Sequence, residues 1–220
     1  MNLELTSLRS HVRQYIVDGI ADGSFCPGDK ISEQEIADAL NVSRTPAREA
    51  LLQLNSEGLL DYFPRRGFSL KRMTEKEKQD NYELVAVLDS YCARIAAPVL
   101  TDAEFRTMHE IIDKIDVAIK YRNVDDYRDL QFRFHSVYRS KAGNEEILRL
   151  LDIAESGIVP QIYLGSDEDQ MQNIYFMLNN EHRRILELLE ARDADNAERY
   201  LRDTHWAPRF PELTEPLPQK

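Results

Sequence analysis

Apolar residues recur at three- and four-residue steps through the first part of the chain, the spacing that places them on one face of an α-helix. This pattern predicts three helices. The first covers about residues 5–22, the second follows Ser32, and the third follows Ser43 and ends near Gly58. Ser32 precedes Glu35 by three residues, the spacing of a capping box, and we expect Ser43 to cap the third helix.

The period of the pattern changes after the third predicted helix. Two short apolar runs, residues 59–63 and 67–71, flank a turn that contains Pro64 and Gly67. Short apolar runs around such a turn predict a β-hairpin. Three helices followed by a hairpin are the elements of a winged helix-turn-helix, in which the helix after the turn enters the major groove of DNA.

Helical periodicity returns near residue 75 and continues almost to the end of the chain. It predicts six helices, at residues 75–97, 102–121, 124–142, 144–164, 170–191 and 194–206. Helices joined by short loops favour an antiparallel bundle. We therefore expect a mainly α fold, with an N-terminal winged helix-turn-helix domain at 1–73, a C-terminal antiparallel six-helix bundle at 74–207 and a proline-rich tail at 208–220.

Composition narrows the class of protein without naming a function. The 220 residues are 42% hydrophobic and 30% charged, as in ordinary soluble domains. No run approaches 18 apolar residues, and the first residues lack the pattern of a signal peptide, so we expect a cytoplasmic protein with no membrane partner. The two cysteines, Cys26 and Cys92, are far apart, and we expect both to be reduced thiols.

Charge is distributed unevenly along the chain, whose net charge is −11. Residues 1–73 carry 9 Lys+Arg and 10 Asp+Glu, a net charge of −1, whereas the remainder carries 19 and 29, a net charge of −10. Within the first part, residues 62–72 hold basic side chains and no acid. This distribution permits DNA binding by the predicted winged helix and disfavours it for the acidic helical part.

The third predicted helix carries the residues expected to read DNA. Arg44 and Arg48 are four positions apart, so both guanidinium groups emerge on one side, and arginine matches the two acceptors on guanine. Ser43 and Thr45, at the helix N-terminus, are expected to contact phosphates, and Gln34 is expected to contact the DNA backbone or a base. The alternative for the two arginines is a solvated helix face.

The tip of the predicted hairpin adds a second contact. Arg65 and Arg66 supply positive charge for a minor groove, and Gly67 permits a close approach to it. The order of capped helix, turn, arginine-bearing helix and basic hairpin favours DNA binding over a solvated helix face.

A family resemblance rests on four segments of this first part. Residues 27–33 (PGDKISE), 42–51 (VSRTPAREAL), 57–59 (EGL) and 65–67 (RRG) resemble the GntR family of bacterial transcription regulators. The resemblance spans almost all of residues 8–72. It implies that Arg44, Arg48 and Gly67 contact operator DNA.

The helical part resembles the FadR-type effector domain of the same family, called FCD, in its shorter VanR-like form with six helices. The residues that carry this looser resemblance are Phe134 and His135, 142–144 (AGN), 181–186 (EHRRIL) and His205. The resemblance implies a domain that binds a small-molecule effector.

Three histidines, His135, His182 and His205, fall on three different predicted helices. Converging imidazoles inside a bundle can bind a divalent transition metal such as zinc or nickel. The resemblance implies a fourth ligand, an Asp four residues before the first histidine, and that position is Gln131 here. The alternative is three buried, hydrogen-bonded histidines around an empty or organic-ligand pocket.

The resemblance also assigns Asp89 and Asn144 to the effector pocket. Asp89 stands where the family usually has Glu, and Val85 stands where it often has an Arg that holds the effector's carboxylate. These changes favour an effector less acidic than the sugar acids and small organic acids typical of the family. Three other cations of the helical part, each expected at the surface, are Arg94, Arg133 and Arg139.

These features together predict a homodimeric transcriptional regulator, more specifically a repressor, that binds an inverted-repeat operator through the winged helix. A small molecule in the bundle, with or without a metal, is expected to change the operator affinity. Two alternatives stay open. One is a metal-dependent enzyme in which the histidine-bound metal activates water, and the other is a regulator whose bundle serves only dimerisation.

Overall fold

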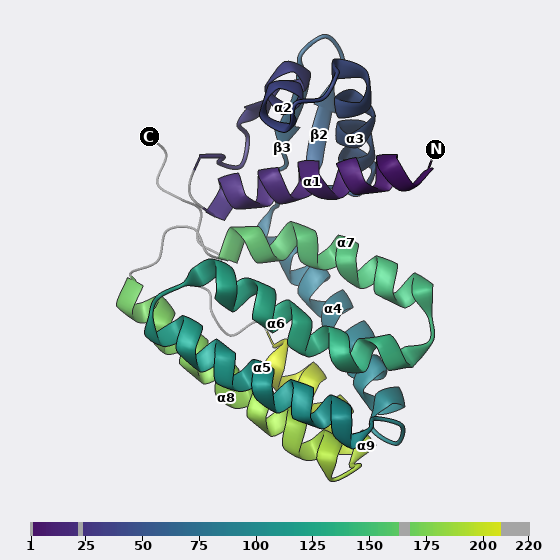
Figure 1. Cartoon of the computed structure of the whole chain (residues 1–220), viewed down its shortest axis with the longest axis vertical. Helices are drawn as coiled ribbons and strands as arrows, with labels where there is room; N and C mark the ends of the chain where they lie inside the picture. The colour runs from purple at the N-terminus through teal and green to yellow at the C-terminus, as the bar shows by residue number, and fades with distance from the viewer. Residues whose placement is uncertain (1, 22–23, 163–167, 208–220) are drawn as a thin grey trace. The chain divides into compact units, whose positions relative to one another are not determined.

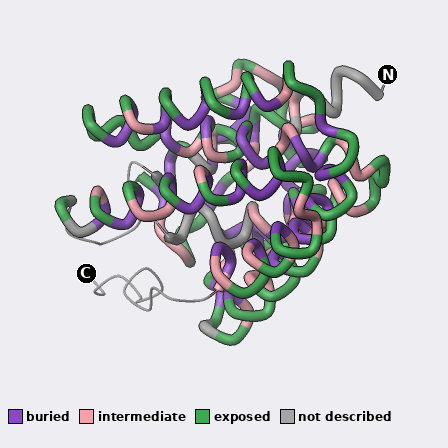
Figure 2. Tube along the Cα trace, turned by 90° about the horizontal axis from the view of Figure 1, so that it is seen from below, coloured by how far each residue is buried: buried purple, intermediate pink, exposed green. Residues whose placement is uncertain are grey.

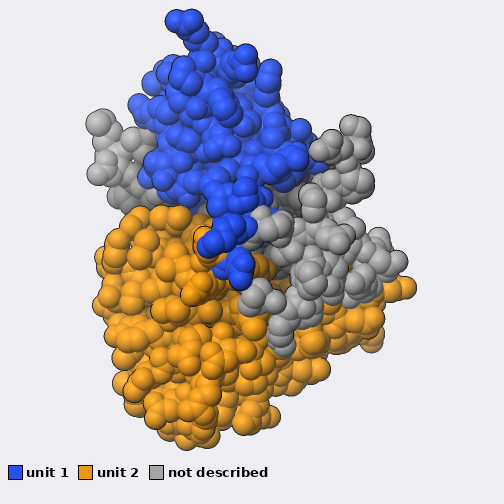
Figure 3. All heavy atoms as spheres, turned by 180° about the vertical axis from the view of Figure 1, so that it is seen from behind, with its two compact units in different colours: residues 1–79, 155–165, 210–220 blue, residues 80–154, 166–209 orange. Residues whose placement is uncertain are grey.

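The computed structural model describes residues 2–21, 24–162 and 168–207 of the chain (Figure 1). The chain divides into two compact units (Figure 3). The winged-helix unit is residues 1–79, 155–165 and 210–220, and the helical unit is residues 80–154 and 166–209. The predicted boundary after residue 73 stays a prediction, and the predicted tail at 208–220 lies outside the described residues.

The described residues up to Leu70 form the winged helix itself, with three helices and a small sheet. Their order is α1 (Asn2–Ala21), β1 (Lys30–Ile31), α2 (Glu33–Leu40), α3 (Arg44–Ser56), β2 (Leu60–Phe63) and β3 (Gly67–Leu70). The strands are antiparallel in the order β1-β3-β2, with Tyr62 opposite Phe68 in the hairpin. The predicted helices and hairpin are confirmed. The sequence does not predict β1, because a two-residue strand has too few positions to show a period.

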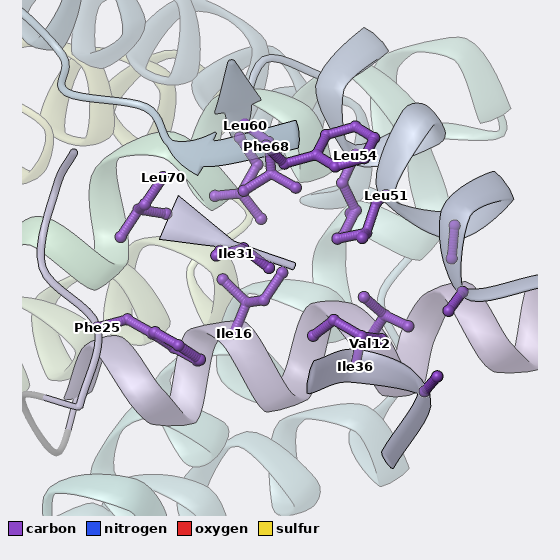
Figure 4. Close-up of a cluster of buried hydrophobic side chains, with 14 residues drawn as sticks. Val12, Ile16, Phe25, Ile31, Ile36, Leu51, Leu54, Leu60, Phe68 and Leu70 are labelled. Carbon is purple, nitrogen blue, oxygen red and sulfur yellow. The ribbon is translucent and has the colours of Figure 1, made fainter. Parts of the chain in front are cut away.

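The core of this unit joins α1, α3 and the sheet (Figure 4). Val12 and Ile16 of α1, Leu51 and Leu54 of α3, and Phe68 of β3 are all buried to 1% exposure or less. Burying each such side chain stabilises the fold by about 1.5–3 kcal/mol. Because this face of α3 is fixed in the core, its opposite face is presented to solvent.

The turn between α2 and α3 is built by local hydrogen bonds. Ser32 Oγ accepts from the backbone N–H of Glu35 at 3.0 Å, and the Glu35 carboxylate accepts from the Ser32 N–H at 3.5 Å, which confirms the predicted capping box. Asn41 ends α2 in the left-handed conformation, with φ 51°. Ser43 is the N-cap residue of α3, as predicted, but its side chain makes no capping hydrogen bond. Pro46, at the third helical position, has no N–H, which removes one of the two amides that an N-cap side chain can bind.

From Glu75 on, the described residues are mainly helical, and the six predicted segments are confirmed. The helices are α4 (Glu75–Ala96), α5 (Asp102–Lys120), α6 (Val124–Arg139), α7 (Glu145–Ile162), α8 (Glu168–Glu190) and α9 (Ala194–Tyr200). A short 3-10 turn, Ser140–Ala142, follows α6, and a π-helical turn, Leu201–His205, follows α9. Within the helical unit, α5 packs alongside both α6 and α8 (Figure 1).

Helices of this unit are buried along one face and exposed along the other, as the alternation of purple and green in Figure 2 shows. On α5 the buried face includes Phe105, Met108, Ile112, Ile115 and Ile119. Burial of such an apolar stripe is the main force that holds a helix in a bundle. Within the described residues, no helix is both long enough and apolar enough to cross a membrane.

Candidate metal centre and DNA-reading surface

The helical unit buries the three predicted histidines together. His135 lies on α6, His182 on α8, and His205 at the end of the π-helical turn, and none is more than 8% exposed. One ring nitrogen of each lies within 4.8 Å of the others, and the Nε2 atoms of His135 and His205 are 3.3 Å apart. Helices distant in sequence therefore bring three imidazoles to one point.

The outer nitrogens of two of these rings are held by carboxylates. His135 Nδ1 lies 3.1 Å from Asp89 Oδ2, and His205 Nδ1 lies 3.0 Å from Glu181 Oε2. A carboxylate oxygen accepts, so each imidazole donates from Nδ1 and keeps Nε2 turned to the centre. Metal-binding histidines are oriented in this way by carboxylates or carbonyls behind them.

The third ring, His182, leaves one nitrogen without a partner. Its Nδ1 lies 3.3 Å from Asn179 Oδ1, whereas its Nε2 is buried and has no hydrogen-bond partner. An unsatisfied buried polar atom costs about 1–3 kcal/mol. A metal ion bound by the three rings would satisfy it, so the donor set fits a divalent transition metal.

Burial keeps the two most enclosed imidazoles neutral, which is the form that binds metal. It lowers the pKa of His135 to about 4 and that of His182 well below the ordinary value of 6.5. For Asp89, burial opposes ionisation, but the Arg139 guanidinium outweighs it and the pKa of the carboxyl is lowered. Because His135 is neutral near pH 7, Arg139 is the positive charge that keeps Asp89 ionised.

Asp89 is the centre of a buried hydrogen-bond network. Arg139 Nε donates to it at 2.6 Å, the Tyr138 hydroxyl at 2.7 Å and Trp206 Nε1 at 2.6 Å, in addition to His135. Arg139 is 4% exposed, so the expectation that it lies at the surface is wrong. The signal was in its spacing: Arg139 lies four residues after His135 and shares its helix face.

The π-helical turn sets the position of the third histidine. The backbone N–H of Trp206 donates to the Leu201 carbonyl at 3.0 Å, a five-residue step that replaces the usual four. Such turns are rare and often mark functional sites. Here the turn ends with His205, beside His135, and is followed by Trp206, which reaches Asp89.

The remaining predicted residues of this unit lie at different depths. Gln131 is half-buried on α6, one turn before His135. Asn144 is exposed, and its Oδ1 accepts from the backbone N–H of Glu146 and Ile147 at 3.1 and 3.2 Å, so it caps the start of α7. Asp89 therefore hydrogen-bonds to one of the histidines, His135, whereas the Asn144 side chain binds the start of α7.

On the winged-helix unit, Arg44 and Arg48 emerge together from α3. Their side chains are 65% and 52% exposed, and Glu33 of α2 lies 3.3 Å from Arg44 Nη2 and 3.6 Å from Arg48 Nε. Thr45 is exposed beside them. One carboxylate therefore spans the two arginines, and ion pairs this exposed are weak enough to exchange for contacts with DNA.

The other predicted DNA contacts surround α3. Gln34 is exposed on α2 and donates to Asp38 Oδ1 at 2.7 Å. Ser43 is exposed, and its hydroxyl makes no capping bond. At the hairpin tip, Arg65 and Arg66 are exposed and Gly67 has φ 85°, the left-handed region that favours glycine.

Two family models match the chain. The model described as "Bacterial regulatory proteins, gntR family" matches residues 8–70, and the model described as "FCD domain" matches residues 80–205. The first match contains α2, α3 and the hairpin, and the second contains the three histidines. Regulators of the first family bind DNA, and FCD domains bind small-molecule effectors.

Curated relatives and solved structures agree with these matches. The HTH-type transcriptional repressor RspR of Escherichia coli (strain K12) is 25% identical over 173 residues, 79% of this chain and 75% of that protein. The gluconate operon transcriptional repressor of Bacillus licheniformis is 25% identical over 188 residues, 84% and 74% of the two chains. The structure of E. coli McbR/YncC has a TM-score of 0.78 at 18% identity and covers 94% of this chain and 97% of that one, which shows a shared fold.

Proposed function

The chain belongs to the GntR family of bacterial regulatory proteins and carries an FCD domain, and on this basis we propose that it is a repressor whose operator affinity is set by a small molecule in the helical unit. It is a DNA-binding transcriptional regulator, and the family and its relatives are regulators rather than enzymes. The relatives named repressors support the same sign of regulation here. Because the chromosome is its target, we place the protein in the cytoplasm.

α3 enters the major groove in this proposal. The observation that carries it is the pair Arg44 and Arg48, exposed on one face of a helix whose other face is fixed in the core. Each guanidinium matches the two acceptor atoms of guanine. The backbone contacts come from Gln34, Ser43 and Thr45, which lie at or before the α3 N-terminus, where free amides attract phosphate.

The hairpin tip takes the neighbouring minor groove. Arg65 and Arg66 supply charge there, and Gly67 keeps the backbone narrow enough to approach the DNA. Each winged helix contacts one half-site of an operator, and two half-sites need two copies of the chain. We therefore propose a homodimer on an inverted repeat.

An exposed apolar stripe on α4 supports the homodimer. Leu84, Val87, Tyr91 and Ile95 recur at three- and four-residue steps and are 40%, 50%, 44% and 37% exposed. The opposite face of α4 is already buried within the helical unit, as at Val85 and Cys92. A helix that is apolar on a second, exposed face marks an interaction surface, and we propose that a second copy covers it.

His135, His182 and His205 hold the metal, zinc or nickel, in this proposal. The support is the convergence of three neutral or carboxylate-oriented imidazoles and the unsatisfied Nε2 of His182. Bound there, the metal supplies a Lewis-acid centre with positions left for oxygen atoms of an effector. Gln131 stays a predicted fourth ligand, weaker than the Asp that the family resemblance implies, because an amide brings no negative charge.

The effector binds beside this centre in our proposal and shifts the balance between conformations with different operator affinity. Asp89 and Asn144 stay its predicted neighbours. Asp89 already holds four donors, so its role toward the effector is indirect, through the residues that it fixes.

Operator selection from random DNA, followed by binding assays with the selected site, tests the proposed function. We expect an inverted-repeat consensus and a protein-to-DNA ratio of two chains per site. Operator affinity is then measured for zinc-loaded and chelator-treated protein, with and without a panel of metabolites. Failure to select any consensus would contradict the proposed operator, and an affinity that no metal or metabolite changes would favour a bundle that serves dimerisation alone.

A further inference from the structure

We propose that Asn179 is a positioning residue of the metal centre, which holds the His182 imidazole with its proton on Nδ1 and its lone pair on Nε2. The inference rests on the proposed metal site and concerns a residue outside its ligand set. Asn179 is fully buried on α8, nearly one turn before His182, and its Oδ1 lies 3.3 Å from His182 Nδ1.

The orientation of the Asn179 amide is fixed from its other side. Its Nδ2 donates to the backbone carbonyl of Ile112 at 3.1 Å and to Asp116 Oδ1 at 2.7 Å, both on α5. Turning the amide over would place Oδ1 against two acceptors and lose both hydrogen bonds. Oδ1 must therefore face His182, and because an amide oxygen only accepts, Nδ1 of His182 carries the proton.

Asp116 is held in its accepting role by a further group. Arg183, which follows His182 on α8, donates to Asp116 Oδ2, and the two side chains are each 38% exposed. A chain of donors and acceptors thus runs from a half-exposed ion pair through Asn179 to a buried imidazole. Each member fixes the hydrogen-bonding direction of the next, which is how a buried polar network specifies one arrangement.

The consequence falls on the inner nitrogen of His182. With the proton on Nδ1, the lone pair is on Nε2, the buried nitrogen that has no hydrogen-bond partner. The opposite tautomer would present an N–H to the centre and repel a cation. Asp89 and Glu181 stand behind the other two rings in the same way, but as carboxylates. Asn179 is the uncharged member of the set, so it acts on the tautomer without adding charge.

The tautomer of His182 in the metal-free protein tests this role directly. Long-range 1H–15N correlation spectra of the histidine side chains show which ring nitrogen carries the proton. We expect Nδ1–H on His182 in the unmodified protein and an Nε2–H population in Asn179→Leu, which loses the acceptor. The matched control is Asn173→Leu, at an exposed position six residues earlier on α8, which should leave the His182 signals unchanged.

Zinc affinity, measured by competition with a chromophoric chelator, is the second readout. We expect zinc to bind about 10–100-fold more weakly to Asn179→Leu than to the unmodified protein, and equally well to Asn173→Leu and the unmodified protein. Asp116→Ala removes one of the two acceptors that orient the Asn179 amide, so we expect a smaller loss in the same direction. Asp116 is half-exposed, so this variant carries the test if circular dichroism shows that Asn179→Leu does not fold.

The two proposals fail in different ways. An unmodified protein that binds no zinc overturns the metal site, whereas a tautomer that changes only in Asn179→Leu still supports the positioning role. Equal zinc affinity in the unmodified protein, Asn179→Leu and Asp116→Ala, with His182 unchanged in tautomer, overturns the positioning role and leaves the metal site standing.

Discussion

Arg139 donates from Nε to Oδ1 of Asp89 across 2.6 Å, and both side chains are buried in the helical unit. The pair joins α4 to the end of α6, and Asp89 also accepts from Tyr138 and Trp206. The same carboxylate therefore orients His135 and ties the C-terminal turn to two helices. The position of His135, and part of the stability of the unit, therefore depend on this buried charge pair.

Removing the guanidinium should leave that carboxylate buried without its charge partner. We expect Arg139→Met to lower the free energy of unfolding by about 3–5 kcal/mol, measured by urea denaturation of the metal-free protein. The control is Arg133→Met on the same helix, whose pair with Asp129 is exposed, and its change should stay within about 0.5 kcal/mol. Equal stability of the two variants would contradict the role given to the buried pair.

The buried histidines should make the metal-free protein sensitive to acid. An unfolded imidazole has a pKa of about 6.5, whereas burial holds the pKa of His135 at about 4 and that of His182 well below 6.5. Below pH 6.5 the unfolded chain binds protons that the folded state does not. The free energy of unfolding therefore falls by about 1.4 kcal/mol per pH unit for each such histidine, down to the pKa of that histidine in the folded state.

We therefore expect the melting temperature of the metal-free protein to be level above pH 7 and to fall between pH 6.5 and 4. His182→Gln should reduce the slope, and His109→Gln, at an exposed position, should not. A melting temperature independent of pH across this range would show that the imidazoles are not held neutral by burial.

Arg48 should contribute directly to the reading of operator bases. We expect Arg48→Ala to weaken binding to the selected operator by about 1–3 kcal/mol and to relax the base preference at one position of each half-site. Fluorescence anisotropy at fixed salt concentration measures both effects. Arg184→Ala removes an exposed arginine from the helical unit and should bind as the unmodified protein does. If Arg48→Ala bound the operator as tightly as the unmodified protein, the proposal that α3 enters the major groove would be wrong.

The α4 stripe should control the oligomeric state. Val87 lies within it and is 50% exposed, so Val87→Glu would place a charge in an otherwise apolar contact. We expect sedimentation velocity at micromolar concentration to shift from dimer toward monomer, with weaker operator binding as a result. Val117→Glu changes a valine of similar exposure on α5 and should leave the dimer intact. If only Val117→Glu dissociated the dimer, the dimer interface would not lie on the α4 stripe.

The elements of the fold were predictable because their signals are local. The capping box at Ser32 and Glu35 fixes the start of α2 within four residues, and apolar periodicity fixes the buried faces. Errors arose where a neighbour changes the local rule. Pro46 removes one of the two amides that Ser43 could bind as an N-cap, and the π-helical turn before Trp206 departs from the period on which the helix prediction rests.

The candidate site was predictable only in part. The three histidines were identified by a family resemblance and because they lie on three different predicted helices. The structure brings them together. Their partners were not identified, because a partner depends on which helices converge. Asp89 and Trp206 are 117 residues apart in the chain and share a hydrogen bond. No spacing in the sequence encodes such a pair, whereas the four-residue step from His135 to Arg139 does place both side chains on one face of α6.

The indole of Trp206, which donates to Asp89, also has an optical consequence. It is the only tryptophan in the sequence, and its ring centre lies 5.4 Å from that of His135 and 5.2 Å from that of His205. Excitation at tryptophan wavelengths therefore samples one spot in the molecule, the edge of the histidine cluster. The only intrinsic tryptophan fluorophore therefore lies beside the proposed metal site. Binding of a metal or effector there should change the tryptophan fluorescence of the unlabelled protein.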